Sequence, residues 1–227
     1  MLFLFLIGVS NPVAAQSAAA LESAPAATAV ERFKKVDGRM NQLVEEGKWN
    51  GGSGLVFKDG KEIYFSTWGD ADRERKKPIK RDTIFRIYSM SKPITSVAVM
   101  QLVEQGTIKL DEPVSTYLPE LADLKVLEKS KDAEGGFVEV APKRAMTTRD
   151  LLRHTSGFTY GFFGNTEVDK RYRRDGVLGE ATIAGTVKKL GTIPLLNHPG
   201  TRFHYSVSSD VLGRLVEVAS GERFDKY

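Results

Sequence analysis

A serine and a lysine three positions apart are the residues of this 227-residue chain best suited to chemistry. Ser89 and Lys92 lie in the stretch FRIYSMSKPITSVAVMQLVEQG, residues 85–106, at the start of an apolar run. Residues three apart on a helix share one face, so the hydroxyl and the amine can meet. We expect the apolar run to form a buried helix, whose free N–H groups and positive dipole end would stabilise an oxyanion at Ser89.

The same surroundings would change the protonation of the lysine. Burial and the helix field disfavour an ammonium group, so we predict that the pKa of Lys92 falls toward the range of a usable base. A serine beside a base is an activated nucleophile. The S-x-x-K pattern alone is weak, because it occurs about once by chance in a chain of this length. The alternative is that Ser89 caps the helix and Lys92 lies on the surface.

Composition excludes several other kinds of site. The chain has no cysteine, which rules out disulfides, thiolate metal sites and a cysteine nucleophile. Three scattered histidines without an H-E-x-x-H pattern predict no metal, and we expect no cofactor because Walker and dinucleotide patterns are absent. The net charge is +4, and the basic stretch RERKKPIKR, residues 73–81, lacks interleaved aromatic residues. We interpret it as a solvated loop and expect no nucleic-acid partner.

The first residues suggest export. Residues 1–15 contain LFLFLIGVS, an apolar block too short to span a bilayer, followed by NPVAA, in which Val13 and Ala15 suit a signal-peptidase site. No basic residue precedes the block, so the alternatives are a true start that lies upstream and a plain hydrophobic N-terminus. Residues 16–30 are rich in Ala, Ser and Thr, which predicts a disordered spacer. We therefore expect a periplasmic or secreted protein with no stable membrane span and a folded domain over residues 31–227.

Periodicity predicts the elements that would position the pair. Helical spacing from about Val30 to Glu46 predicts an amphipathic helix, and alternation on both sides of Asp59 and Gly60 predicts an antiparallel hairpin. Residues beyond Phe85 favour helices and loops, and the stretch from Phe158 to Gly179 could line a pocket. Neither a repeat nor a doubly wound sheet is indicated. The helices predicted there cover residues 93–106, residues 147 or 148 to 157, and a segment from residue 208 that ends at Gly221.

Three blocks, taken in order, carry a family resemblance. They are residues 85–121, which begin FRIYSMSK, residues 146–157, MTTRDLLRHTSG, and residues 199–221, PGTRFHYSVSSDVLGRLVEVASG. Together they resemble the serine β-lactamase-like family, which includes class C β-lactamases, D-alanyl-D-alanine carboxypeptidases and β-lactamase-like carboxylesterases. The resemblance runs from about Val30 to Tyr227. It implies an α+β, β-lactamase/transpeptidase-like fold, represented here by a mostly helical region and by a helix and antiparallel hairpin from an incomplete central sheet.

The resemblance also implies roles for individual residues. It makes Ser89 the acylated nucleophile, Lys92 its partner in proton transfer, and Tyr205 of YSV the tyrosine of the second motif. A phenol can act as a general base only if nearby ammonium groups lower its pKa from about 10. Whether Lys92 or Tyr205 takes the proton stays open at this point.

The chain departs from the family pattern in two places. Val207 stands where peptidases and β-lactamases commonly have asparagine, and it cannot hold the acylamino carbonyl of a substrate. This favours an ester over a peptide or β-lactam. The third motif, Lys-Thr-Gly or a variant, does not follow Tyr205. We therefore expect the N-terminal portion of a longer enzyme, and we expect the 227-residue chain alone to be poorly stable and inactive.

The predicted function is that of a carboxylesterase that forms an acyl-enzyme on Ser89 with a small ester or amide substrate. The alternatives are a β-lactamase or D-alanyl-D-alanine carboxypeptidase, and a non-catalytic, penicillin-binding-like module. His154, His198 and His204 are interpreted as structural, although His204 could touch the pocket. GGSGL, residues 51–55, lacks the last glycine of G-x-S-x-G, so an α/β-hydrolase nucleophile elbow is not predicted.

Overall fold

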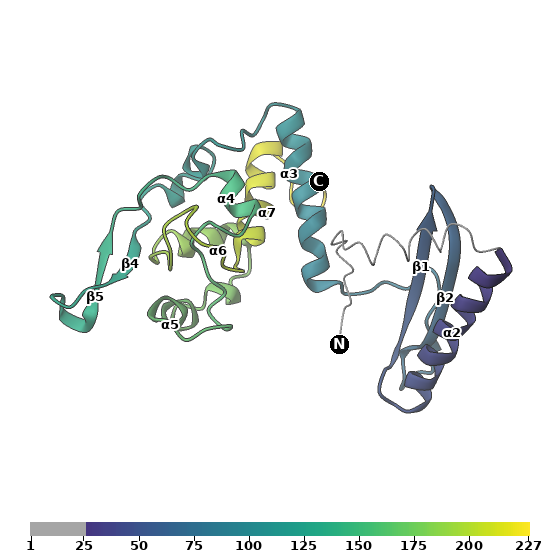
Figure 1. The fold of residues 1–227 in the computed structure, drawn as a ribbon. Coiled ribbons are helices and arrows are strands. Elements are labelled where there is room, and N and C mark those ends of the chain that lie inside the picture. Colours follow the sequence, from purple (N-terminus) through teal and green to yellow (C-terminus); the bar gives the residue numbers. More distant parts are fainter. Residues whose placement is uncertain (1–25) are drawn as a thin grey trace, which may run out of the picture. The chain divides into compact units, whose positions relative to one another are not determined.

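The computed structural model describes residues 26–227 and divides the chain into two compact units, Met1–Arg86 and Ile87–Tyr227 (Figure 1). The predicted signal peptide, residues 1–15, lies outside the described residues. So does the predicted spacer, residues 16–30, except for its last five residues. The combination of helices with small antiparallel sheets confirms the predicted α+β class.

The first unit contains a helix packed against a three-stranded antiparallel sheet of order β1-β2-β3 (Figure 1). Its elements are α2 (Ala26–Glu45), β1 (Gly51–Lys58), β2 (Lys61–Asp72) and β3 (Lys77–Pro78). The Phe33 ring stacks on Tyr64 with centroids 4.3 Å apart. Asp37 accepts hydrogen bonds from Tyr64 Oη at 2.7 Å and from Trp68 Nε1 at 2.8 Å, which ties α2 to β2.

The hairpin prediction is confirmed. Asp59 and Gly60 join β1 to β2, with φ of 51° and 72°, the left-handed values that a two-residue hairpin turn requires. The helix begins earlier than the predicted Val30, because Ala-rich sequence favours helix formation and extends α2 back to Ala26. The last residues of the predicted spacer are therefore helical. The short strand β3, which lies within the basic stretch, was not predicted, and its residues are exposed.

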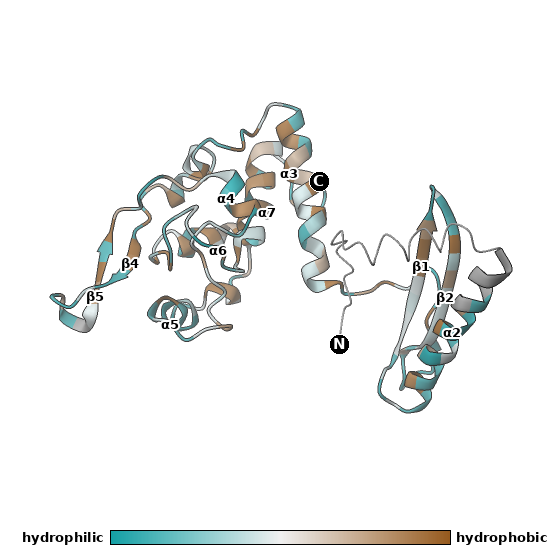
Figure 2. Cartoon of the chain, in the orientation of Figure 1, coloured by the Kyte–Doolittle hydropathy of each residue, from teal (hydrophilic) through white to brown (hydrophobic). Residues whose placement is uncertain are grey.

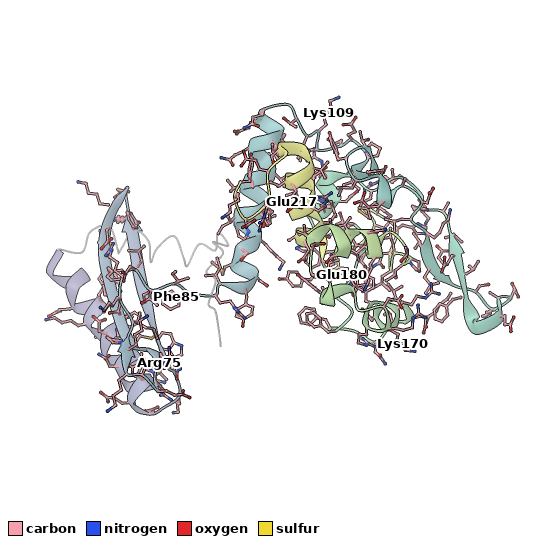
Figure 3. All side chains as sticks on the ribbon, turned by 180° about the vertical axis from the view of Figure 1, so that it is seen from behind. Arg75, Phe85, Lys109, Lys170, Glu180 and Glu217 are labelled. Atoms are coloured by element: carbon pink, nitrogen blue, oxygen red, sulfur yellow. The ribbon has the colours of Figure 1, made fainter. Side chains whose placement is uncertain are left out.

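The second unit is mostly helical, and its core forms around α7, against which α3, α4 and α6 pack (Figure 1). Figure 2 shows the apolar residues of α7, and Figure 3 shows the side chains between these helices, with Glu217 marking α7 and Lys170 marking α5. The elements are α3 (Ser91–Glu104), β4 (Val126–Lys129), β5 (Phe137–Val140), α4 (Thr148–Leu152), α5 (Glu167–Arg174), α6 (Ile183–Leu190) and α7 (Ser208–Ser220).

The helix after Ser89 is less buried than expected. Thr95, Val99 and Leu102 are the buried residues of α3. Ile94 and Val97 are 62% and 60% exposed. Among the described residues the prediction of a buried helix therefore holds for one face of α3 only, and the apolar side chains of Ile94 and Val97 are left uncovered.

Two helix predictions in this unit need correction. α4 ends at Leu152 rather than near Gly157, because His154 adopts a left-handed φ of 54° that a right-handed helix cannot continue. The stretch from Phe158 to Gly179 is not one loop, since α5 occupies its centre. The α5 N-cap is Thr166, whose side chain forms a reciprocal capping box with Asp169. The end of α7 at Gly221, with φ of 77°, agrees with the prediction.

No helix within residues 26–227 is long and apolar enough to cross a membrane.

The N-cap of α4 is Thr147, one of the two predicted candidates, and it forms a capping box with Asp150. Asp150 also pairs with Arg144 at 2.6 Å, and the guanidinium holds the carboxyl ionised although its side chain is buried. Burial raises the pKa of Asp150, but Arg144 and Thr147 lower it more. Thr155 Oγ1 also donates to Asp150 Oδ1 at 3.1 Å, so the network holds the loop that follows α4.

Candidate active site

Ser89 lies in a 3-10 turn, Tyr88–Met90, that leads directly into α3. The residue before it, Tyr88, has a left-handed φ of 47°. Bulky side chains rarely adopt this conformation, and such residues concentrate at functional sites. Ser89 itself is exposed, so a substrate can reach its hydroxyl.

The structure brings the three predicted residues together. Ser89 Oγ and Tyr205 Oη share a hydrogen bond of 2.6 Å across 116 positions of sequence. Lys92 Nζ donates to Ser89 Oγ at 3.3 Å. The serine comes from the turn before α3, the lysine from the first turn of α3, and the tyrosine from the segment just before α7. The packing of α3 on α7 therefore builds the site.

The charge of the lysine differs from the prediction. Burial lowers the pKa of Lys92, as expected, but the hydroxyls of Tyr205 and Tyr160 raise it more, so that it ends above its usual value. The Lys92 ammonium also lies 4.8 Å from the centre of the Tyr205 ring and 5.6 Å from that of Tyr160, within the range of cation–π attraction. The pKa of Lys92 therefore shifts in the direction opposite to the predicted fall, because the tyrosine hydroxyls and rings favour the ammonium.

The tyrosine shows the complementary effect. Burial raises the pKa of Tyr205, but Lys92 and then the hydrogen bond from Ser89 lower it more, so that it lies below its usual value of about 10. A lowered pKa increases the fraction of Tyr205 that is ionised to the phenolate near neutral pH. The arrangement thus favours Tyr205 as the proton acceptor for Ser89, with Lys92 as the cation that stabilises it.

A second tyrosine belongs to the site and was not singled out from the sequence. Tyr160 follows α4 in the stretch predicted to line a pocket, and its ring centre lies 5.4 Å from that of Tyr205. Burial raises the pKa of Tyr160, and Lys92 lowers it less, so it remains a neutral phenol. Only the position of Tyr160 in an aromatic and glycine-rich stretch pointed to it.

The histidines take structural places. His154 Nδ1 accepts a hydrogen bond from the Ser206 N–H at 3.3 Å, and its ring lies 4.9 Å from that of Tyr205. Burial, and then the charge of Lys92, lowers the pKa of His154, so the ring is neutral. His204 Nε2 lies 3.3 Å from Thr159 Oγ1, and His198 pairs with Glu128 at 2.7 Å. Among these, His154 is the one that supports Tyr205 directly.

Three buried serines fix the turn that carries Tyr205. Ser208 Oγ lies 2.7 Å from Ser156 Oγ and 2.8 Å from Ser206 Oγ, which links the loop after α4 to the start of α7. Val207, between two of these serines, is fully buried in the core. Within residues 26–227 no group of His, Cys, Asp and Glu side chains could hold a metal ion.

Comparison with known proteins gives one consistent result. Residues 36–227 match the family described as Beta-lactamase. Esterase EstB from Burkholderia gladioli is 32% identical over 191 residues, which cover 83% of this chain and 45% of EstB.

Two solved structures agree with this match. EstCE1, a hydrolase with promiscuous acyltransferase activity, is 34% identical with a TM-score of 0.72, over 86% of this chain and 48% of EstCE1. The simvastatin synthase LovD from Aspergillus terreus is 28% identical with a TM-score of 0.70, over 84% of this chain and 49% of LovD. The chain thus spans about half the length of these relatives.

Proposed function

Because this chain belongs to the β-lactamase family, we propose that the protein is a serine hydrolase that cleaves carboxylic esters through an acyl intermediate on Ser89. The observation that carries the proposal is the contact of Ser89 Oγ with Tyr205 Oη at 2.6 Å and with Lys92 Nζ at 3.3 Å. A nucleophile, a base and a cation that stabilises the base are the groups that acyl transfer needs. EstB, which is called an esterase, supports the choice of substrate class.

The proposed reaction uses the triad twice. The Tyr205 phenolate takes the Ser89 proton as Oγ attacks the ester carbonyl, while the Lys92 ammonium stabilises the negative charge. Tyr205 then returns this proton to the leaving alkoxide, and the alcohol departs from the acyl-enzyme. In the second half, the phenolate takes a proton from water, which attacks the acyl carbon. Ser89 leaves with the proton held by Tyr205, and the carboxylic acid is released.

The burial of Val207 supports an ester over an amide substrate. A peptide or β-lactam carries an acylamino group that needs a hydrogen-bonding partner next to the catalytic tyrosine. Val207 has an apolar side chain with no exposed surface, so it cannot supply that partner. Leaving a substrate amide unpaired in a desolvated site would cost about 1–3 kcal/mol.

The substrate class is tested on the full-length protein with two chromogenic substrates. We expect measurable turnover of p-nitrophenyl acetate. The kcat/KM for the cephalosporin nitrocefin should be at least about 100-fold lower, because one missing hydrogen bond to the substrate amide and the resulting misalignment of the substrate together have an effect of this order. Val207→Asn serves as the matched variant: it adds a side-chain amide, so it should raise nitrocefin turnover relative to that of the ester without reaching the level of the ester. Turnover of nitrocefin alone would instead assign a β-lactamase.

Acyl transfer to an alcohol is a second candidate, favoured by EstCE1, which is described as a hydrolase with promiscuous acyltransferase activity. The acyl-enzyme is the same, and an alcohol replaces water as the attacking group. Addition of a primary alcohol to the ester assay distinguishes the two activities. A new ester as the main product would assign an acyltransferase, and free acid as the main product would assign a hydrolase.

A further inference from the structure

Three exposed phenylalanines surround the catalytic tyrosine. Phe162, Phe163 and Phe203 are 57%, 69% and 65% exposed, whereas Phe158, a few positions earlier, is fully buried in the core. Burial of a large aromatic side chain lowers the free energy of the folded protein, so three exposed ones beside a reactive group need an explanation. We call Phe162, Phe163 and Phe203 the aromatic platform.

The platform is in contact with the catalytic group. The Phe163 ring centre lies 6.1 Å from that of Tyr205, and Phe162 packs on Phe163 at 4.3 Å. Phe203 reaches the other side through His154, whose ring lies 6.0 Å from Phe203 and 4.9 Å from Tyr205. These spacings are those of favourable aromatic pairs, which orient the rings relative to one another.

The loop that carries Phe162 and Phe163 is held by hydrogen bonds from α5. Arg173 of α5 donates hydrogen bonds to the carbonyl of Gly161, to that of Gly164 at 3.1 Å, and to Asn165 Oδ1 at 2.7 Å. The loop is therefore anchored by one guanidinium along its length. Its two phenylalanines project outward from a fixed backbone.

The same loop is closed at its ends, and its Gly164 position leaves no room for a side chain. The buried carboxylate of Asp169 accepts hydrogen bonds from Thr159 at 2.6 Å and from Thr166 at 2.7 Å, which joins the two ends. A Cβ on Gly164 would lie 2.5 Å from Asp169 Oδ2. The loop is thus built to present two aromatic rings at a defined place, at little cost in conformational freedom when a ligand binds.

We infer that the aromatic platform binds the alcohol part of the ester, and that the preferred substrates are esters of bulky, planar, apolar alcohols. The inference rests on the proposed function. In that reaction Tyr205 returns its proton to the leaving oxygen, so the alcohol part must lie beside the Tyr205 hydroxyl. Tyr160 and His154 lie nearer to the Tyr205 ring, but the exposed apolar rings in this place are Phe163, directly, and Phe203, through His154. An apolar ring in this place removes both its own surface and the exposed phenylalanine surface from water.

Two isomeric esters test on which side of the scissile bond the platform acts. 2-Naphthylmethyl acetate carries the ring on the alcohol, methyl 2-naphthylacetate carries it on the acid, and methyl acetate is the common reference. In the full-length protein we expect Phe163→Ala to lower kcat/KM for 2-naphthylmethyl acetate, relative to methyl acetate, by about tenfold. The corresponding ratio for methyl 2-naphthylacetate should change by less than about twofold. Phe203→Ala should act in the same direction.

Phe137→Ala, at an exposed phenylalanine on β5, is the matched control and should change neither ratio. Because Phe163 is exposed, its replacement should leave the thermal midpoint of unfolding unchanged, which circular dichroism checks. A fall confined to methyl 2-naphthylacetate, or unchanged ratios in both platform variants, would overturn the inference. Neither result affects the proposed function, which would fail separately if the wild-type protein hydrolysed none of the three esters.

Discussion

Replacement of Ser89 with alanine is expected to lower kcat/KM for ester hydrolysis in the full-length protein by about 10⁴-fold or more. The acyl group is proposed to form on the Ser89 hydroxyl, which contacts both Lys92 and Tyr205. Initial rates with p-nitrophenyl acetate measure the loss. Ser91→Ala, two positions further along in the first turn of α3, is the matched control and should retain wild-type rates.

Covalent labelling makes the serine prediction decisive. A fluorophosphonate probe should add to the wild-type and Ser91→Ala proteins and not to Ser89→Ala, and peptide mass spectrometry should place the adduct on Ser89. Undiminished hydrolysis by Ser89→Ala would contradict the proposed nucleophile. An unlabelled Ser89 in a wild-type protein without esterase activity would favour a non-catalytic, penicillin-binding-like module.

The second large effect is expected for Tyr205→Phe. This change removes the oxygen that lies 2.6 Å from Ser89 Oγ and keeps the ring that packs on His154. Loss of the general base should lower kcat for ester hydrolysis by about 10³-fold. Because substrate contacts outside the hydroxyl are kept, KM should change much less. Steady-state kinetics on the full-length variant measure both constants.

The Tyr160→Phe variant tests whether Tyr205, rather than the neighbouring Tyr160, is the general base. Tyr160 lies next to Lys92 and Tyr205 but makes no hydrogen bond with Ser89 in the described part of the chain. Its loss should cost about tenfold in kcat, through a weaker hold on Lys92. Equal losses in the two variants, or a larger loss for Tyr160→Phe, would contradict the assignment of the base to Tyr205.

Local sequence signals predicted the elements that depend on neighbouring residues alone. Asp59 and Gly60 fixed the hairpin, and Gly221 fixed the end of α7. The early end of α4 was missed because it depends on the left-handed His154, a conformation imposed by the chain that surrounds it. The start of α5 could have been found, since Thr166 and Asp169 carry a capping-box signal.

Some features of the site could likewise be predicted from the sequence, and others could not. The resemblance selected Ser89, Lys92 and Tyr205, and the structure places them in contact, while their catalytic roles remain predictions. The charge of Lys92 could not be predicted, because a burial argument omits the two tyrosines that stabilise the ammonium. Hydrophobic periodicity could not predict the exposure of Phe163 either, since that exposure depends on the hydrogen bonds from Arg173 to the carbonyls of Gly161 and Gly164 in the same loop.

The central claim is that the Lys92 ammonium makes the Tyr205 phenol acidic enough to act as the base for Ser89. The most direct measurement is the ultraviolet titration of Tyr205 in the full-length protein, taken as the difference between wild type and Tyr205→Phe near 295 nm. Because Lys92 lowers the pKa of Tyr205, the phenolate should form with a midpoint below pH of about 10 in the wild type, and the midpoint should rise in Lys92→Met. A wild-type midpoint at or above pH of about 10, or one unchanged by Lys92→Met, would contradict the claim.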